Sequence, residues 1–390
     1  MNDQEAKKEE EALYETPNRW FRWKYMLPLA LILLAVVAGF IYWLQLSRQG
    51  FTRADLAASY EVQESSGAGY ASFGGGFLRY SADGVCLFTP EGREKWNISY
   101  SMSQPKLVMQ GDYGAVADLS GRKVIVFSKN GLSGSYNTVM DIQNIAVSGK
   151  GLTAVSLDDG LTSRVQMYES SGKRLDIEMS FEMSLSGYPL ALALSPDGTG
   201  LVISFVSGST TALSSQIAFY NFNVGKSDPD RLMGFFRYDG QLLPQLEYLG
   251  ADRVIAVGDS SIEVFSLAQE NKPELLKSLP LPAQISVCQL GAKHIGLLYP
   301  SPSTGKMTLD VYDADGELSF SRETNGNCRS LRLEEAGVLF LSDSGLSLIS
   351  YTGKIRYSGS LSRTGQVMFM SGSRTILQFD GSHIYRYRLK

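Results

Sequence analysis

Short segments of alternating apolar and polar residues fill the chain beyond residue 60. β-Branched and aromatic residues are frequent in them, and clusters of Gly, Asp and Ser separate them roughly every 8–12 residues. This pattern is typical of antiparallel strands that end in tight turns. No stretch of this region shows sustained helical periodicity, so the sequence predicts an all-β domain.

Two seventeen-residue segments of the chain follow the same pattern of glycine, apolar and polar positions. "YSADGVCLFTPEGREKW" (Tyr80–Trp96) aligns without a gap with "LSDSGLSLISYTGKIRY" (Leu341–Tyr357). Looser copies of the same strand–turn–strand pattern lie between them. Together they define eight units that start near residues 70, 106, 144, 190, 244, 286, 329 and 366, a mean spacing of about 42 residues.

Units of about 40 residues with four short strands each are the signature of a β-propeller. We predict eight blades, with seven as the alternative. The last unit ends at Lys390 after three strands, and Ala57–Glu64 is the candidate for its fourth strand, which would remove an exposed edge. The repeated acidic residues read as turn residues that bond nearby backbone: Asp83, Asp159, Asp197, Asp315 and Asp343.

An uncharged stretch of 21 residues, Met26–Leu46, precedes this domain. As a helix it would span about 30 Å, the thickness of the hydrocarbon core of a bilayer. Trp20 and Trp23 flank one end, and Tyr42 with Trp43 mark the other, as expected of an interfacial belt. The apolar segment is longer than that of a cleaved signal peptide, which favours a retained anchor.

The division of the chain follows from this anchor. We predict a cytoplasmic tail over residues 1–25, a transmembrane helix over 26–46, a tether over 47–56 and a propeller over 57–390. Five Lys or Arg residues precede the span, whereas only Arg48 and Arg53 follow it closely, so the positive-inside rule places the propeller outside the cytoplasm.

Composition narrows the function further. The chain has 390 residues and a net charge of −4, and residues 60–390 hold 29 basic and 33 acidic side chains. Without a basic excess, nucleic acid is not expected as a partner. Of the three cysteines, Cys288 and Cys328 would pair if the fold joined them; the alternative is that all three are buried apolar residues.

Signs of catalysis are scarce. The two histidines, His294 and His383, lie about ninety residues apart on predicted strands, and no zinc-binding spacing, phosphate loop or nucleophile elbow occurs. We therefore predict no cofactor, no metal site and no catalytic residues. Carboxylates gathered with a histidine at one end of the propeller axis would instead favour an enzyme.

The candidate protein-binding residues are Phe235, Phe236, Arg237 and Tyr238, because aromatic residues with Arg are enriched at interface hot spots. They follow the third strand of the fourth unit. The alternative interpretation is that they are simply the outer strand of that blade.

The segment "LFTPEGREKW" (Leu87–Trp96) resembles the Trp-docking motif of quinoprotein-type eight-bladed propellers, in which Gly-Lys-x-x-Trp follows a blade strand. Gly92, Arg93 and Trp96 match it, while Phe320 and Tyr357 replace the Trp in two other units. The repeated pattern of strands and turns in each blade is shared with WD40-like propellers. The vicinal cysteines typical of quinone enzymes are absent. The whole layout resembles an uncharacterised family of anchored extracytoplasmic propellers from Firmicutes, a domain of unknown function.

These observations predict a membrane-anchored module at the bacterial cell envelope that binds or scaffolds a protein, with a glycan as the second choice of ligand. The alternative is an envelope enzyme or glycan-binding protein that uses the central funnel of the propeller.

Overall fold

The computed structural model describes residues 50–390, except 63–66, 161, 209–212, 224–230, 270–271, 283–284, 292, 302, 325, 364 and 366. It also describes residues 28, 31–34 and 37, which are helical. In this described part of the chain, no helix is long and apolar enough to cross a bilayer. The rest of the predicted span Met26–Leu46, and the predicted belt of Trp20, Trp23, Tyr42 and Trp43, lie outside the described residues.

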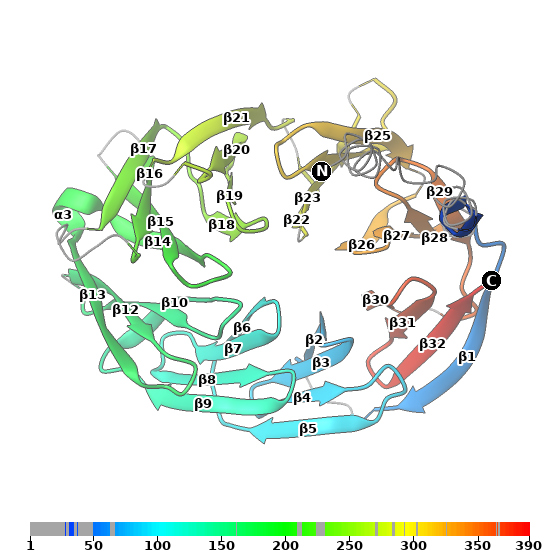
Figure 1. Cartoon of the computed structure of the whole chain (residues 1–390), viewed down its shortest axis with the longest axis horizontal. Coiled ribbons are helices and arrows are strands. Elements are labelled where there is room, and N and C mark those ends of the chain that lie inside the picture. Colours follow the sequence, from blue (N-terminus) through cyan, green and yellow to red (C-terminus); the bar gives the residue numbers. More distant parts are fainter. Residues whose placement is uncertain are drawn as a thin grey trace, which may run out of the picture. The chain divides into compact units, whose positions relative to one another are not determined.

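Residues Phe51–Lys390 form one compact unit of eight four-stranded antiparallel sheets. The sheets follow one another around a central axis (Figure 1), which confirms an eight-bladed β-propeller. We number the blades along the chain, and in blades 1 to 7 the four strands run consecutively from the axis outward.

The strands of blades 1 to 4 are as follows. Blade 1 contains β2 (Gly69–Phe73), β3 (Gly76–Ser81), β4 (Gly84–Phe88) and β5 (Glu94–Ser99); blade 2 contains β6 (Pro105–Gln110), β7 (Tyr113–Asp118), β8 (Lys123–Ser128) and β9 (Gly131–Asn137). Blade 3 contains β10 (Asp141–Val147), β11 (Thr153–Asp158), β12 (Thr162–Tyr168) and β13 (Arg174–Glu182), followed by the single helical turn α3 (Met183–Ser186). Blade 4 contains β14 (Tyr188–Leu194), β15 (Gly200–Gly208), β16 (Leu213–Asn221) and β17 (Leu232–Asp239).

The remaining blades complete the ring. Blade 5 contains β18 (Gln245–Tyr248), β19 (Arg253–Val257), β20 (Ser261–Ser266) and β21 (Glu274–Pro280); blade 6 contains β22 (Val287–Leu290), β23 (His294–Pro300), β24 (Met307–Asp313) and β25 (Leu318–Thr324). Blade 7 contains β26 (Cys328–Glu334), β27 (Gly337–Ser342), β28 (Gly345–Ile349) and β29 (Ile355–Gly359); blade 8 contains β30 (Val367–Ser371), β31 (Thr375–Phe379), β32 (His383–Leu389) and β1 (Ala54–Glu61).

Blade 8 joins the two ends of the domain. Its outermost strand is β1, which pairs antiparallel with β32 from Ala54 opposite Leu389 to Glu61 opposite His383. This confirms the predicted closure by the N-terminal segment. The strand begins three residues earlier than predicted, so the expected boundary at residue 57 falls inside β1.

Burial differs between the middle and outer strands. In β8, "KVIVFS", the four central residues are all buried, because a middle strand has a neighbouring blade on each face. In β13, "RLDIEMSFE", exposed and less exposed positions alternate. A continuous apolar run in the sequence thus indicates a middle strand of a blade, and an alternating run indicates an outer strand.

At several blade junctions, an aromatic side chain of one blade packs on a turn glycine of the next blade. The Trp96 ring lies beside Gly131 in the next blade, and its Nε1 donates to the Lys129 carbonyl oxygen at 3.3 Å. In the same way Tyr60 of β1 packs on Gly92, and Phe320 on Gly353. Gly92 and Gly353 have φ near +77°, a backbone conformation that favours glycine. A Cβ at Gly92 would also lie 2.9 Å from the Tyr60 ring, so both the backbone conformation and the packing require glycine there.

Candidate functional site

The strand ends define two faces of the propeller. The turns between second and third strands, and the connections from one blade to the next, lie on one face. The turns between first and second strands, and between third and fourth strands, lie on the other. Because β1 begins opposite the end of β32, residues 51–53 enter on this second face, which we call the entry face.

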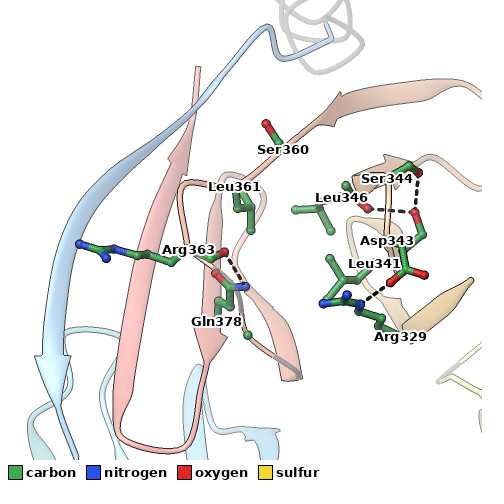
Figure 2. Close-up of a pocket in the computed structure, with 12 residues that line it drawn as sticks. Arg329, Leu341, Asp343, Ser344, Leu346, Ser360, Leu361, Arg363 and Gln378 are labelled. Carbon is green, nitrogen blue, oxygen red and sulfur yellow. Dashed lines mark hydrogen bonds and ion pairs between the residues drawn. The ribbon is translucent and has the colours of Figure 1, made fainter. Parts of the chain in front are cut away.

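A pocket of about 240 Å³ opens on the first face, between blades 7 and 8. We call this the pocket face. The lining comes from the β27–β28 turn, the connection from β29 to β30, and β31. Figure 2 shows Arg329 and Asp343 on one side and Gln378 on the other, while the Arg363 side chain points away. Leu341, Leu346 and Leu361 supply the apolar lining.

The polar groups of the pocket are held by each other. Arg329 Nε donates to Asp343 Oδ1 at 2.6 Å, and hydrogen bonds from Arg329 and Asn327 lower the pKa of Asp343, so the pair stays ionised. Across the pocket, the buried Gln378 amide donates from Nε2 to the Arg363 carbonyl oxygen at 3.2 Å. The pocket is therefore lined by three leucines and the buried Gln378 amide, with one charged pair at its edge.

Sequence reasoning missed this pocket. Asp343 sits in the turn that the repeat predicted, but its carboxylate bonds Arg329. Asp315 of blade 6 likewise bonds an arginine of the neighbouring blade 5, since Arg253 Nε donates to its Oδ1 at 2.6 Å. By contrast, Asp159 and Asp197 accept backbone N–H groups two or three residues ahead, as predicted. No local motif marks the pocket, because its lining residues come from separate strands and turns.

The predicted binding residues of blade 4 lie together on β17, the outer strand, and point in alternating directions. Phe235 is 57% exposed, and the exposed Arg237 pairs with Asp239 at 2.8 Å. The Phe236 ring instead packs on Phe219 and Phe265. Tyr238 also faces blade 5, where its hydroxyl lies 3.5 Å from Glu263. Only Phe235 and Arg237 thus present their side chains to solvent.

The innermost strands carry polar groups that link the blades. Lys106 Nζ donates to Asn144 Oδ1 at 2.7 Å, and Asn144 Nδ2 donates to the Leu190 carbonyl oxygen at 2.9 Å, joining blades 2, 3 and 4. Burial lowers the pKa of Lys106. It also raises the pKa values of Glu247 on β18 and Glu334 on β26 to about 7.

The two histidines lie apart from one another. His294 stacks on Tyr351 with ring centroids 3.5 Å apart, and the Tyr351 hydroxyl donates to the Glu334 carbonyl oxygen. His383 accepts or donates at Nδ1 with Ser382, in the β31–β32 turn. The described residues contain no group of three His, Cys, Asp or Glu side chains able to hold a metal ion.

The three cysteines are thiols in the structure. Cys86 is buried, whereas Cys288 and Cys328 are half-buried in neighbouring blades. Burial, with the nearby Glu247 carboxylate as a smaller contribution, raises the pKa of Cys288 to about 11. These are poorly reactive thiols at neutral pH.

Several solved structures share this architecture. Sqt1 from Chaetomium thermophilum, solved bound to the N-terminus of ribosomal protein L10, is 12% identical, with a TM-score of 0.55 over 86% of this chain and 100% of that one. AztD from Citrobacter koseri is 12% identical, with a TM-score of 0.53 over 79% and 89%. At these identities the likeness shows the fold alone.

A search of curated protein sequences finds no match. A family model matches residues 47–389, beginning directly after the predicted membrane span. The Firmicutes origin of the protein stays a prediction. The family model is that of DUF5711, a family of unknown function. Because this model covers nearly the whole chain, the chain belongs to the DUF5711 family.

Proposed function

We propose that this protein is a membrane-anchored recognition module of the cell envelope, which binds a protein partner on the pocket face of its propeller. In this proposal Met26–Leu46 spans the membrane, the N-terminus is cytoplasmic and the propeller is extracytoplasmic. The uncharged span and the Lys/Arg asymmetry support the anchor and its orientation. The protein acts by binding, without a cofactor.

The observation that carries this proposal is the size and lining of the pocket. Ligand and cofactor sites usually have about 300–1,000 Å³, whereas this one has about 240 Å³. Its leucines and the Arg329–Asp343 pair suit one apolar side chain of a partner, whose backbone would bond the charged pair at the edge. Sqt1, which shares the fold, is described as bound to a protein terminus.

A second candidate is an envelope enzyme or glycan-binding protein that uses the funnel. The raised pKa values of Glu247 and Glu334 favour it, because perturbed carboxyl groups on inner strands are a feature of active sites. We rank it second, because these two carboxyl groups lie on the inner strands of two different blades, 5 and 7.

The test is a crosslinking pull-down of the full-length protein from its native membrane, read by mass spectrometry. We expect a reproducible envelope protein that is lost in Leu361→Glu, because a carboxylate would enter the apolar lining. Leu361 is a suitable target since it lies on a connection, outside the strands.

The matched variant on the alternative surface is Phe235→Ala with Arg237→Ala on blade 4. If that variant loses the partner and Leu361→Glu keeps it, the site lies on β17 and the pocket proposal is wrong. A purified protein that captures no protein but retains a glycan or small molecule would support the funnel instead.

A further inference from the structure

An exposed aliphatic side chain recurs at one position of the outer strands. In each blade the fourth strand has a register shift near its start, and the residue just before the shift faces the end of the third strand. In five consecutive blades, 4 to 8, this residue is aliphatic and 40–52% exposed: Leu232, Leu275, Leu318, Ile355 and Leu56. All five lie on the entry face, because third strands end there.

Basic residues gather around two of these positions, on blades 7 and 8. We call Arg53, Lys354, Arg356, Arg374, Arg388 and Lys390 the entry-face cluster. Backbone bonds bring its members together: Thr52 and Arg53 donate to the Lys390 carbonyl oxygen at 2.7 and 3.2 Å, and Leu389 donates to that of Arg374 at 2.8 Å.

The positive charge of this cluster is only partly compensated. Asp55 pairs with Lys390 at 2.9 Å and with Arg53 at 3.3 Å, and Glu335 lies in the β26–β27 turn of the same face. Desolvation and the nearby Arg374 lower the pKa of Arg356. Among the described residues, Arg374 and Arg388 take part in none of the ion pairs of this face.

The chain enters the propeller at this cluster. The Phe51 N–H donates to the Arg356 carbonyl oxygen, and the Arg356 guanidinium lies 5.1 Å from the Phe51 ring centroid. Four residues lie between Phe51 and the end of the predicted span at Leu46, which makes five Cα–Cα steps. Extended, they reach at most about 18 Å, so an anchor in the membrane would hold this face close to the lipid headgroups.

We propose that the entry face of blades 7 and 8 rests on an anionic lipid bilayer. The entry-face cluster contacts the acidic headgroups, each basic residue being attracted by the negative surface, and Leu56 and Ile355 enter the interface. This inference rests on the proposed membrane anchor and adds a fixed orientation, in which the pocket face points away from the membrane.

The test uses the full-length protein in lipid nanodiscs that contain a photoreactive phospholipid. Crosslinked peptides are identified by mass spectrometry, in anionic phosphatidylglycerol discs and in neutral phosphatidylcholine discs. We expect crosslinks to residues 51–56, 353–356 and 372–374 in anionic discs, several-fold fewer in neutral discs or high salt, and none on the β27–β28 turn.

Charge variants separate this contact from simple proximity. Arg374→Gln with Arg388→Gln should reduce the entry-face crosslinks several-fold, whereas Arg374→Lys with Arg388→Lys should keep them. The matched control, Arg122→Gln with Lys306→Gln, removes two exposed charges from pocket-face turns and should change nothing.

The outcomes distinguish the two proposals. Crosslinks to Met26–Leu46 without any to the entry face would overturn the docking surface and leave the anchor intact. Absence of crosslinks to Met26–Leu46 would overturn the anchor itself. Equal crosslinking of both propeller faces would show that the domain tumbles freely on its tether, which also contradicts this inference.

Discussion

At the scale of single residues, the contacts between blades depend on a few aromatic rings. Trp96 combines three interactions with blade 2: its ring lies 5.5 Å from that of Phe127, it covers Gly131, and its indole donates to Lys129. The sequence marked this tryptophan through its spacing from Gly92, but not its partners, which belong to another repeat.

Trp96→Ala should lower the free energy of unfolding by about 2–3 kcal/mol, since it removes a large, partly buried ring and one hydrogen bond. Trp96→Phe should lose less, because the ring contact with Phe127 survives. Urea unfolding of both variants beside the wild type measures the difference. Equal stability of Trp96→Ala and the wild type would show that the docking contact does not hold the blades together.

The raised pKa of Glu247 predicts how the stability of the folded protein changes with pH. Because burial raises its pKa from 4.5 to about 7, the folded protein binds an extra proton between these values. The free energy of unfolding contributed by this residue is therefore highest below about pH 4.5, falls as the pH rises, and levels off above about pH 7. Glu247→Gln should remove this loss.

The measurement compares unfolding at pH 5 and pH 8. The stability lost between these values should shrink in Glu247→Gln by an amount on the order of 1–3 kcal/mol. Glu94→Gln, on the exposed outer strand of blade 1, is the matched control. A loss of the same size in wild type and Glu247→Gln would mean that Glu247 is solvated.

At the scale of elements, the strand β1 decides whether the ring closes. It pairs along its whole length with β32 and brings Tyr60 onto Gly92, so it completes blade 8 and joins it to blade 1. The missing strand of the last unit was visible in the sequence, because a three-stranded final unit leaves an edge that needs a partner.

Replacing Ala57–Glu64 by Gly and Ser residues of equal number should destabilise the propeller by several kcal/mol while keeping the tether length. The replacement leaves the chain connected but removes the side chains and the strand propensity of the last five residues of β1. Thermal unfolding of the full-length protein gives the readout. An unchanged melting temperature would show that closure by β1 is dispensable.

At the scale of the whole molecule, the two faces of the propeller have different properties. The entry face carries the basic cluster and exposed aliphatic residues, and the other carries the pocket between blades 7 and 8. An anchor that holds the entry face against lipid would therefore leave the pocket open to an envelope partner.

A reporter that is active only outside the cytoplasm, fused after Lys390, should be active in cells. The same reporter fused within the first 25 residues should be inactive, since the Lys/Arg asymmetry keeps that tail inside. Activity of both fusions, or of the N-terminal fusion alone, would contradict the predicted orientation.

The sequence alone predicted the strands, the eight units and the closing strand. These features are readable because each blade is built from hairpins between neighbours in the chain, and burial of each strand imposes a local pattern. The same alternation, applied to Phe235–Tyr238, implies two directions for their side chains, but not which pair faces blade 5.

Only the tertiary structure decided the surfaces. The pocket joins Arg329, Asp343 and Gln378 from two blades, and the entry-face cluster joins residues from both ends of the domain. Such groups form when the ring closes and brings distant segments together. Because each segment meets its own packing needs independently, none carries a sequence signal of the group to which it belongs.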